Sequence, residues 1–106
     1  MTKTKLDQII EDITKQLIKR YKPEKIILFG SATKGQFKPD SDLDFLIVKK
    51  NVPQYGYQRM NQVRKLIKKK VPADFLVYQS EEFQGLIDSG EPFLQVILKE
   101  GKLLYG

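Results

Sequence analysis

Two short motifs in this sequence carry residue types suited to phosphate and metal chemistry. Gly30-Ser31 ends the apolar run of residues 25–29, and Asp42-Leu43-Asp44 follows after ten further residues. A glycine turn can bring backbone N–H groups close to phosphate oxygens. Paired carboxylates can hold the magnesium ion that accompanies a nucleotide triphosphate. The spacing therefore predicts a nucleotide site built from a turn and a strand.

The paired carboxylates should point to one side of their strand. Residues two apart in a strand share a face, so we expect Asp42 and Asp44 to project together while Leu43 and Phe45 face the opposite side. Carboxylates this close repel each other and raise each other's pKa unless a cation lies between them. Asp74 begins another apolar run and completes a triad if its strand lies alongside.

A division of roles follows from two-metal chemistry, in which one ion activates the attacking oxygen and the other binds the triphosphate. Asp42 and Asp44 would bridge the two ions. Asp74 would bind the ion near the nucleophile and accept its proton. With no histidine and no cysteine in the chain, proton and metal chemistry must use Asp, Glu, Lys or Tyr.

The turn is expected to hold the phosphates. Gly30 permits close approach of the backbone, Ser31 adds a hydroxyl donor, and residues 32–35 can form a short helical turn whose N–H groups face the phosphates. Lys34 either adds a positive charge to the phosphates or is a solvated side chain. Each motif alone has an ordinary structural reading as a turn or a surface strand, and the case depends on their order and spacing.

Periodicity predicts one α/β domain spanning residues 1–106, with helices packed on a small mixed sheet. A helix over 4–21 is expected to start at Thr4 as N-cap and to end before Pro23, and a second helix over 57–71 ends at Pro72. Residues 36–41 read as a loop. The remaining expected elements are strands at 25–29, 42–48, 74–78 and 102–105, a helix starting near Ser80, and a helix over 93–100.

Charge is unevenly distributed along the chain. The net charge is +6, but residues 45–73 hold eight basic residues and no acidic one, whereas the rest of the chain sums to −2. This basic segment, residues 45–73, is either a solvated face or a docking face for a partner. Nucleic-acid binding through Arg59 to Lys70 is the weakest reading, because no recognition motif accompanies the charge. No run is long enough to span a membrane and no signal peptide is visible, so we expect a cytoplasmic protein.

The order G-S-x10-D-x-D, followed by a third acid, resembles the signature of the polymerase β-type nucleotidyltransferases. Nearly the whole chain resembles their smallest members, the minimal nucleotidyltransferases. The resemblance implies their α/β fold, ATP with Mg2+ at a two-metal site, metal ligands at Asp42, Asp44 and Asp74, and a phosphate-binding pair at Gly30 and Ser31. The family often has arginine where Lys34 stands, so a bidentate phosphate contact is not expected there.

The resemblance also implies a partner. Many minimal nucleotidyltransferases are antitoxins of HEPN-domain ribonucleases, and some transfer AMP to a tyrosine of that toxin. A chain of 106 residues leaves little room for an acceptor-binding domain, so an arriving protein would complete the cleft. The alternatives are an antitoxin that neutralises its partner by binding alone, and nucleotidyl transfer to a small molecule, for which a homodimer could build the acceptor site.

Overall fold

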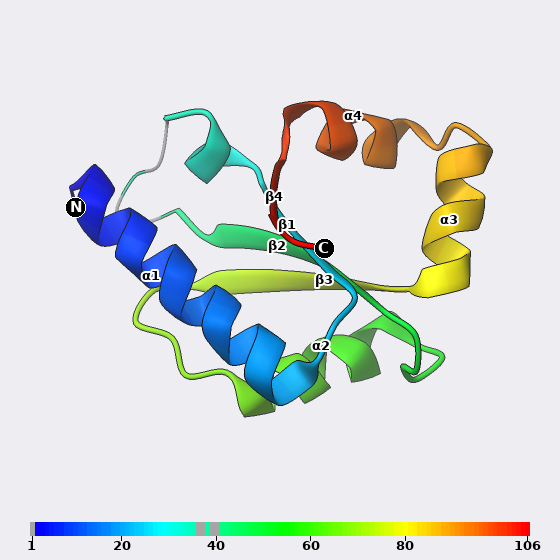
Figure 1. Cartoon of the computed structure of the whole chain (residues 1–106), viewed down its shortest axis with the longest axis horizontal. Coiled ribbons are helices and arrows are strands. Elements are labelled where there is room, and N and C mark those ends of the chain that lie inside the picture. Colours follow the sequence, from blue (N-terminus) through cyan, green and yellow to red (C-terminus); the bar gives the residue numbers. More distant parts are fainter. Residues whose placement is uncertain (1, 36–37, 39–40) are drawn as a thin grey trace.

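The computed structural model describes residues 2–35, 38 and 41–106 and forms three layers (Figure 1). A four-stranded sheet with the strand order β3-β2-β1-β4 lies between α1 and α2 on one face and α3 and α4 on the other. The elements are α1 (Lys3–Gln16), the π-helical turn η1 (Leu17–Tyr21), β1 (Lys25–Phe29), the 3-10 turn η2 (Ser31–Thr33), β2 (Leu43–Lys49), α2 (Gly56–Leu66), β3 (Ala73–Gln79), α3 (Ser80–Asp88), α4 (Pro92–Glu100) and β4 (Lys102–Tyr105). The α/β fold and mixed sheet expected from the sequence are confirmed.

The sheet combines both kinds of strand pairing. β1 pairs antiparallel with β2 and with β4, whereas β2 and β3 run parallel. Two strands that run parallel begin at the same end of the sheet, so residues that open β2 and β3 become neighbours. The parallel pairing therefore brings the first residues of β2 and of β3 together.

The two faces of the sheet pack against separate apolar clusters. Along β2, alternate residues divide between the clusters. Leu43 and Phe45 belong to the cluster beneath α1 and α2, whereas Leu46 and Val48 belong to the cluster beneath α3 and α4. Phe45 and Phe75 stack with ring centroids 5.6 Å apart and join β2 to β3 within the first cluster. The strands are thus held rigidly on both sides.

Two expectations about helix boundaries were wrong. α1 begins at Lys3 with Thr2 as its N-cap, because the Thr2 hydroxyl accepts a hydrogen bond from the Lys5 N–H, so Thr4 lies inside the helix. α2 ends at Leu66, five residues before the expected end at Val71. The predicted loop at 36–41 falls largely outside the described residues.

Tertiary contacts explain the early end of α2. Arg20 donates to the Leu66 carbonyl, and the side-chain amide of Gln16 both donates to the Lys68 carbonyl and accepts from the Lys68 N–H. Ile67 has extended backbone angles and is buried in the first cluster. The backbone here bonds to side chains of α1 and η1, and the helix does not continue.

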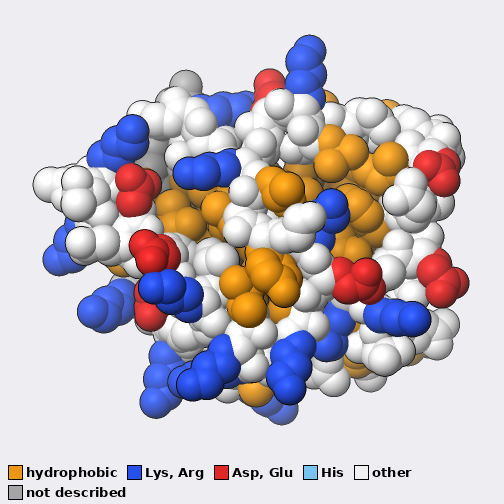
Figure 2. Space-filling model, in the orientation of Figure 1, with side chains coloured by type: hydrophobic (Ala, Val, Ile, Leu, Met, Phe, Trp, Pro, Cys, Tyr) orange, Lys and Arg blue, Asp and Glu red, His pale blue; other side chains and the backbone are white. Residues whose placement is uncertain are grey.

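No helix in the described part of the chain is long and apolar enough to cross a membrane. The face shown in Figure 2 carries apolar side chains in its middle, where β4 runs, and Lys and Arg side chains along its lower margin, over the layer of α1 and α2. Leu103 is 55% exposed and Tyr105 39% exposed on this outer strand.

Candidate active site

The acidic residues meet at the end of the sheet where β2 and β3 begin. In the parallel pairing, Asp44 lies directly opposite Asp74, and across the antiparallel pairing it lies opposite Phe29, the last residue of β1. Asp42 is exposed and precedes β2 by one residue. The expected side-by-side placement of the strands that carry Asp44 and Asp74 is confirmed.

The proximity of the three acids affects the pKa of Asp44. Its pKa is raised above the usual value of 3.8 by partial burial first, then by the negative charges of Asp74 and Asp42. Burial and like charge both disfavour the ionised carboxylate. The fold therefore holds three carboxylates near enough to repel one another, which is an arrangement that a cation would relieve.

The Gly30-Ser31 turn contacts this carboxylate directly. Gly30 has φ +82° and ψ −155°, a conformation available almost only to glycine, and a Cβ at this position would collide with the Asp44 carboxylate. Ser31 opens η2, and the Gly30 carbonyl accepts from the Thr33 N–H at 3.1 Å and from the Thr33 hydroxyl at 2.7 Å. The Gly30-Ser31 turn and β2, which carries Asp44, therefore lie in direct contact.

Lys34 follows η2 and points toward the C-terminal part of the chain. Its Nζ lies 3.5 Å from a carboxylate oxygen of Glu100 in α4, and both side chains are about half exposed. This ion pair places the ammonium group near the turn but gives it a protein partner. A phosphate contact by Lys34 stays a prediction.

Arg64 is a neighbour of the acids that sequence reasoning did not assign to the site. Its Nη2 lies 3.6 Å from Asp74 Oδ1, and both residues line an open pocket of about 450 Å³ together with Asp42 and Lys69. The signal was present in the sequence, since Arg64 belongs to the basic segment that immediately precedes Asp74. The fold brings the end of that segment to the acids.

The donor set suits a hard divalent cation, because all three candidate ligands are carboxylates. Among the described residues, no three acidic side chains already form a group able to hold a metal ion. One oxygen of Asp74 faces Arg64 instead. The chemistry of the residues and the raised pKa of Asp44 fit a metal site, and the roles of Asp42, Asp44 and Asp74 as ligands stay predictions.

The sequence matches the family model for a nucleotidyltransferase domain over residues 9–105. The chain belongs to this nucleotidyltransferase family. A protein of Methanocaldococcus jannaschii, named by inference as a protein adenylyltransferase, is 31% identical over 101 residues. The alignment covers 93% of this nucleotidyltransferase and 97% of that relative. The resemblance that the motifs suggested is confirmed at the level of the family and the enzyme class.

Two solved structures share the fold of this nucleotidyltransferase. A protein of Sulfolobus solfataricus, assigned by inference as a nucleotidyltransferase, superposes with a TM-score of 0.62 at 20% identity and covers 95% of this chain and 80% of its own. A toxin–antitoxin structure with AMP-PNP superposes with a TM-score of 0.51 at 17% identity and covers 100% of this chain and 74% of its own. At these identities the likeness concerns the fold.

Proposed function

We propose that this nucleotidyltransferase moves AMP from ATP to a tyrosine hydroxyl of a partner protein, with Mg2+ as cofactor, and that the partner is a HEPN-type toxin which the transfer silences. The protein would then act as an antitoxin. The observation that carries the proposal is the direct apposition of the Gly30 turn and the Asp44 carboxylate, with Asp74 on the next strand. This proximity supports the proposal, since the turn proposed to bind phosphate and the carboxylates proposed to hold the cation lie side by side.

The chemistry can be assigned to named residues. N–H groups of the turn at Gly30 and Ser31 would bind the β- and γ-phosphates. Asp42, Asp44 and Asp74 would hold Mg2+, which when bound neutralises phosphate charge and lowers the pKa of the attacking hydroxyl. The hydroxyl oxygen forms a bond to the α-phosphorus, the bond from that phosphorus to the bridging oxygen breaks, and pyrophosphate leaves. Asp74 would accept the hydroxyl proton.

The partner assignment draws on the comparisons. One relative is named by inference as a protein adenylyltransferase, and one similar fold occurs in a toxin–antitoxin structure that contains AMP-PNP. The family resemblance supplies the HEPN domain and the tyrosine. A protein acceptor also suits the open pocket at Asp42 and Asp74, which lies at the edge of the sheet formed by β3.

A second candidate function is neutralisation by binding alone. The ion pair between Arg64 and Asp74 favours it, because that contact engages the third acid with a protein partner. The two candidates differ in whether the carboxylates are needed. A binding antitoxin would neutralise its partner without them, whereas a transferase would not.

The test is transfer of label from α-labelled ATP to a HEPN-domain protein encoded beside this chain, with Mg2+ present. The control is the Asp42→Ala/Asp44→Ala variant, whose binding to the partner is measured in parallel. Label on the partner with the wild type alone supports the proposal. A stable complex without label, neutralised equally by the variant, supports the binding antitoxin. Label on an added aminoglycoside, and none on the protein, supports transfer to a small molecule.

A further inference from the structure

We propose that the acceptor protein presents an acidic segment beside its reacting hydroxyl, and that Arg64 and Lys69 recognise this segment at the Asp74 side of the site. The inference rests on the proposed transfer to a protein, since it names which proteins the site accepts. It concerns the pocket of about 450 Å³ whose lining combines Arg64 and Lys69 with Asp42 and Asp74.

The position of this pocket relative to the turn sets the direction of approach. Gly30 lies against Asp44 on the side of β1, an inner strand, whereas Asp74 belongs to β3, an edge strand of the sheet. A triphosphate held by the turn therefore lies on the inner side of the acids. An acceptor hydroxyl must come from the other side, over the edge of β3, and so passes Arg64 and Lys69.

The basic side chains are held in place by contacts of their backbone. The end of α2 and the segment after it are anchored to α1 and η1: Arg20 of η1 donates to the Leu66 carbonyl, and Gln16 of α1 bonds to the backbone of Lys68. These bonds hold the backbone at residues 66–68, directly before Lys69. Lys69 lines the acidic pocket, whereas Lys70 lines a separate pocket beside α1.

The charge of this wall is largely uncompensated by the described residues. The ion pair with Asp74 spans 3.6 Å between two half-exposed side chains, and no described acidic residue lies within ion-pair distance of Lys65, Lys68 or Lys69. Paired surface charges of this kind contribute little to stability. Exposed cations at the entrance to a reaction site select and steer ligands of the opposite charge.

Electrostatic complementarity favours carboxylates on the acceptor. The residues on the pocket's acidic wall, Asp42 and Asp74, would repel an acidic peptide, so the contact is confined to the Arg64 and Lys69 wall. Mg2+ held by Asp42 and Asp74 would offset part of their negative charge. A lysine-rich acceptor would meet the opposite situation, being repelled at the entrance. The acceptor is thus expected to carry Asp or Glu residues next to its tyrosine.

The test measures binding and transfer separately. The probes are two fluorescent peptides, each with one central tyrosine, flanked by glutamates in one and by lysines in the other. Anisotropy is recorded with full-length protein, Mg2+ and α,β-methylene-ATP, which cannot release AMP. The variant Lys69→Glu is compared with Lys70→Glu, which makes the same charge change one residue away, on a side chain that lines the other pocket.

We expect the acidic peptide to bind about tenfold tighter than the basic one at low salt, with a loss of about fivefold in Lys69→Glu and less than about twofold in Lys70→Glu. With ATP in place of the analogue, Lys69→Glu should raise the KM for the acidic peptide and leave the KM for ATP unchanged. An equal effect of the two substitutions, or a raised KM for ATP alone, would overturn the inference, the latter by placing Lys69 at the phosphates.

The outcomes separate this inference from the proposed function. Tight, Lys69-dependent binding of the acidic peptide without transfer of label supports the docking surface and counts against tyrosine as the acceptor. Label on both peptides at equal rates supports transfer and overturns the charge preference. Single-stranded RNA that binds tighter than the acidic peptide, with the same dependence on Lys69, would overturn the inference by making the surface a nucleic-acid site.

Discussion

The two ends of β3 differ in how far the charged groups near them are compensated by partners. At its beginning, Asp74 and Asp44 place carboxylates side by side on neighbouring strands, and the pKa of Asp44 is raised. Toward its end, the Val77 carbonyl accepts a hydrogen bond from Arg59, a guanidinium in a residue that is only 7% exposed. One strand thus joins a region where Asp44 has no ion-pair partner among the described residues, and Asp74 has only the half-exposed Arg64, to a region where the buried charge is fully compensated.

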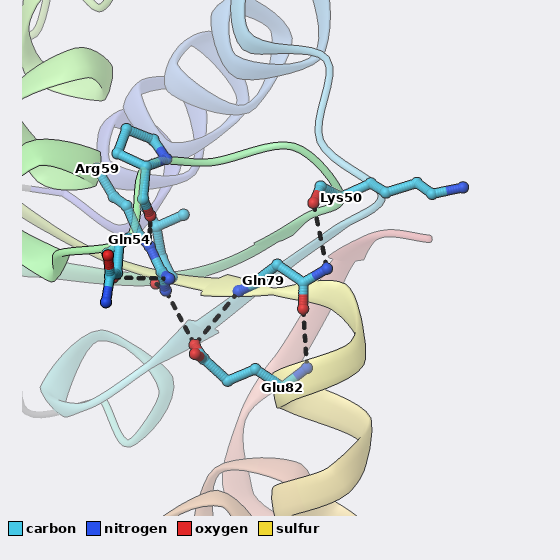
Figure 3. A network of polar contacts seen from close by, with 7 residues as sticks. Lys50, Gln54, Arg59, Gln79 and Glu82 are labelled. Carbon is cyan, nitrogen blue, oxygen red and sulfur yellow. Dashed lines mark hydrogen bonds and ion pairs between the residues drawn. The ribbon is translucent and has the colours of Figure 1, made fainter.

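The Arg59 region satisfies nearly every donor of its cation. Nε donates to the Pro53 carbonyl at 2.6 Å, Nη2 to the Gln54 carbonyl at 3.1 Å, and Nη1 to the Val77 carbonyl at 3.2 Å. Nη1 also forms an ion pair with Glu82 at 2.9 Å (Figure 3). The guanidinium therefore ties the loop before α2 to β3 and α3.

Glu82 extends the compensated region into the start of α3. Its carboxylate accepts from the Gln79 N–H while the Gln79 side chain accepts from the Glu82 N–H, which forms a reciprocal cap, and Gln79 also donates to the Lys50 carbonyl (Figure 3). Buried charge stabilises a fold only when it is paired in this way. The difference indicates that the Arg59 region stabilises the fold, and it supports the proposed role of Asp44 as a cation ligand.

The largest effect is expected at the acids. The substitution Asp44→Asn should lower the rate of AMP transfer by at least about 1000-fold while the fold stays intact, because it removes a negative charge where the cation binds. Transfer is measured with α-labelled ATP, and folding by circular dichroism. The matched change Asp7→Asn, on the exposed part of α1, should leave the rate unchanged. Equal rates in wild type and Asp44→Asn would exclude a catalytic role for this carboxylate.

At Arg59 we expect substitution to lower the stability of the fold. Replacement by Met should lower the free energy of unfolding by about 2–4 kcal/mol, because it leaves three backbone carbonyls and Glu82 without their partner. Urea unfolding measures the change. Arg20→Met provides the control, since the exposed Arg20 makes one hydrogen bond to the Leu66 carbonyl and should cost less than about 1 kcal/mol. Similar losses in both variants would contradict the distinction between the two regions.

The sequence was informative about the acids because their chemistry depends on spacing. Because side chains alternate along a strand, the sequence predicts that Asp44 points away from the face that carries Leu43 and Phe45. The structure has that arrangement, with Leu43 and Phe45 in the core and Asp44 partly exposed. The parallel register that sets Asp44 opposite Asp74 was only conditional in the sequence, because strand pairing is decided by contacts between distant segments. The family resemblance implied the α/β fold but not this strand order or register.

The sequence was misleading about Arg59 for the same physical reason. It was grouped with the basic segment, and an arginine in a run of cations is usually solvated. Its burial depends on carbonyls and on Glu82 from elements far along the chain. Leu66 is 38% exposed, because α2 ends there and the Leu66 carbonyl accepts a hydrogen bond from Arg20 of η1. Local patterns do not contain such long-range contacts.

The next effect concerns the turn that touches Asp44. Gly30→Ala should destabilise the protein by up to about 3 kcal/mol, because its backbone conformation excludes a side chain and its Cβ would meet the Asp44 carboxylate. Gly90→Ala is the control, since Gly90 also has positive φ, +78°, but has nothing within 4 Å of an added Cβ. It should cost about 1 kcal/mol. If the two losses were equal, the contact with Asp44 would contribute nothing.

The smallest expected effect is a gain in the free energy of unfolding when the charge of Asp44 is removed. Such a gain would distinguish Asp44 from Arg59 most clearly. Since the pKa of Asp44 is raised in the folded protein, the folded state binds more protons than the unfolded state just above pH 3.8. The free energy of unfolding contributed by this group therefore falls as the pH rises through that window and stays low above the folded pKa. In EDTA at pH 7.5, Asp44→Asn should stabilise the protein by less than about 1 kcal/mol, since Asp44 is partly solvated and screened. Urea unfolding between pH 4 and pH 8 tests this, with Asp7→Asn expected to give no comparable gain. Destabilisation by Asp44→Asn at pH 7.5 would mean that Asp44, like Arg59, is compensated by the fold.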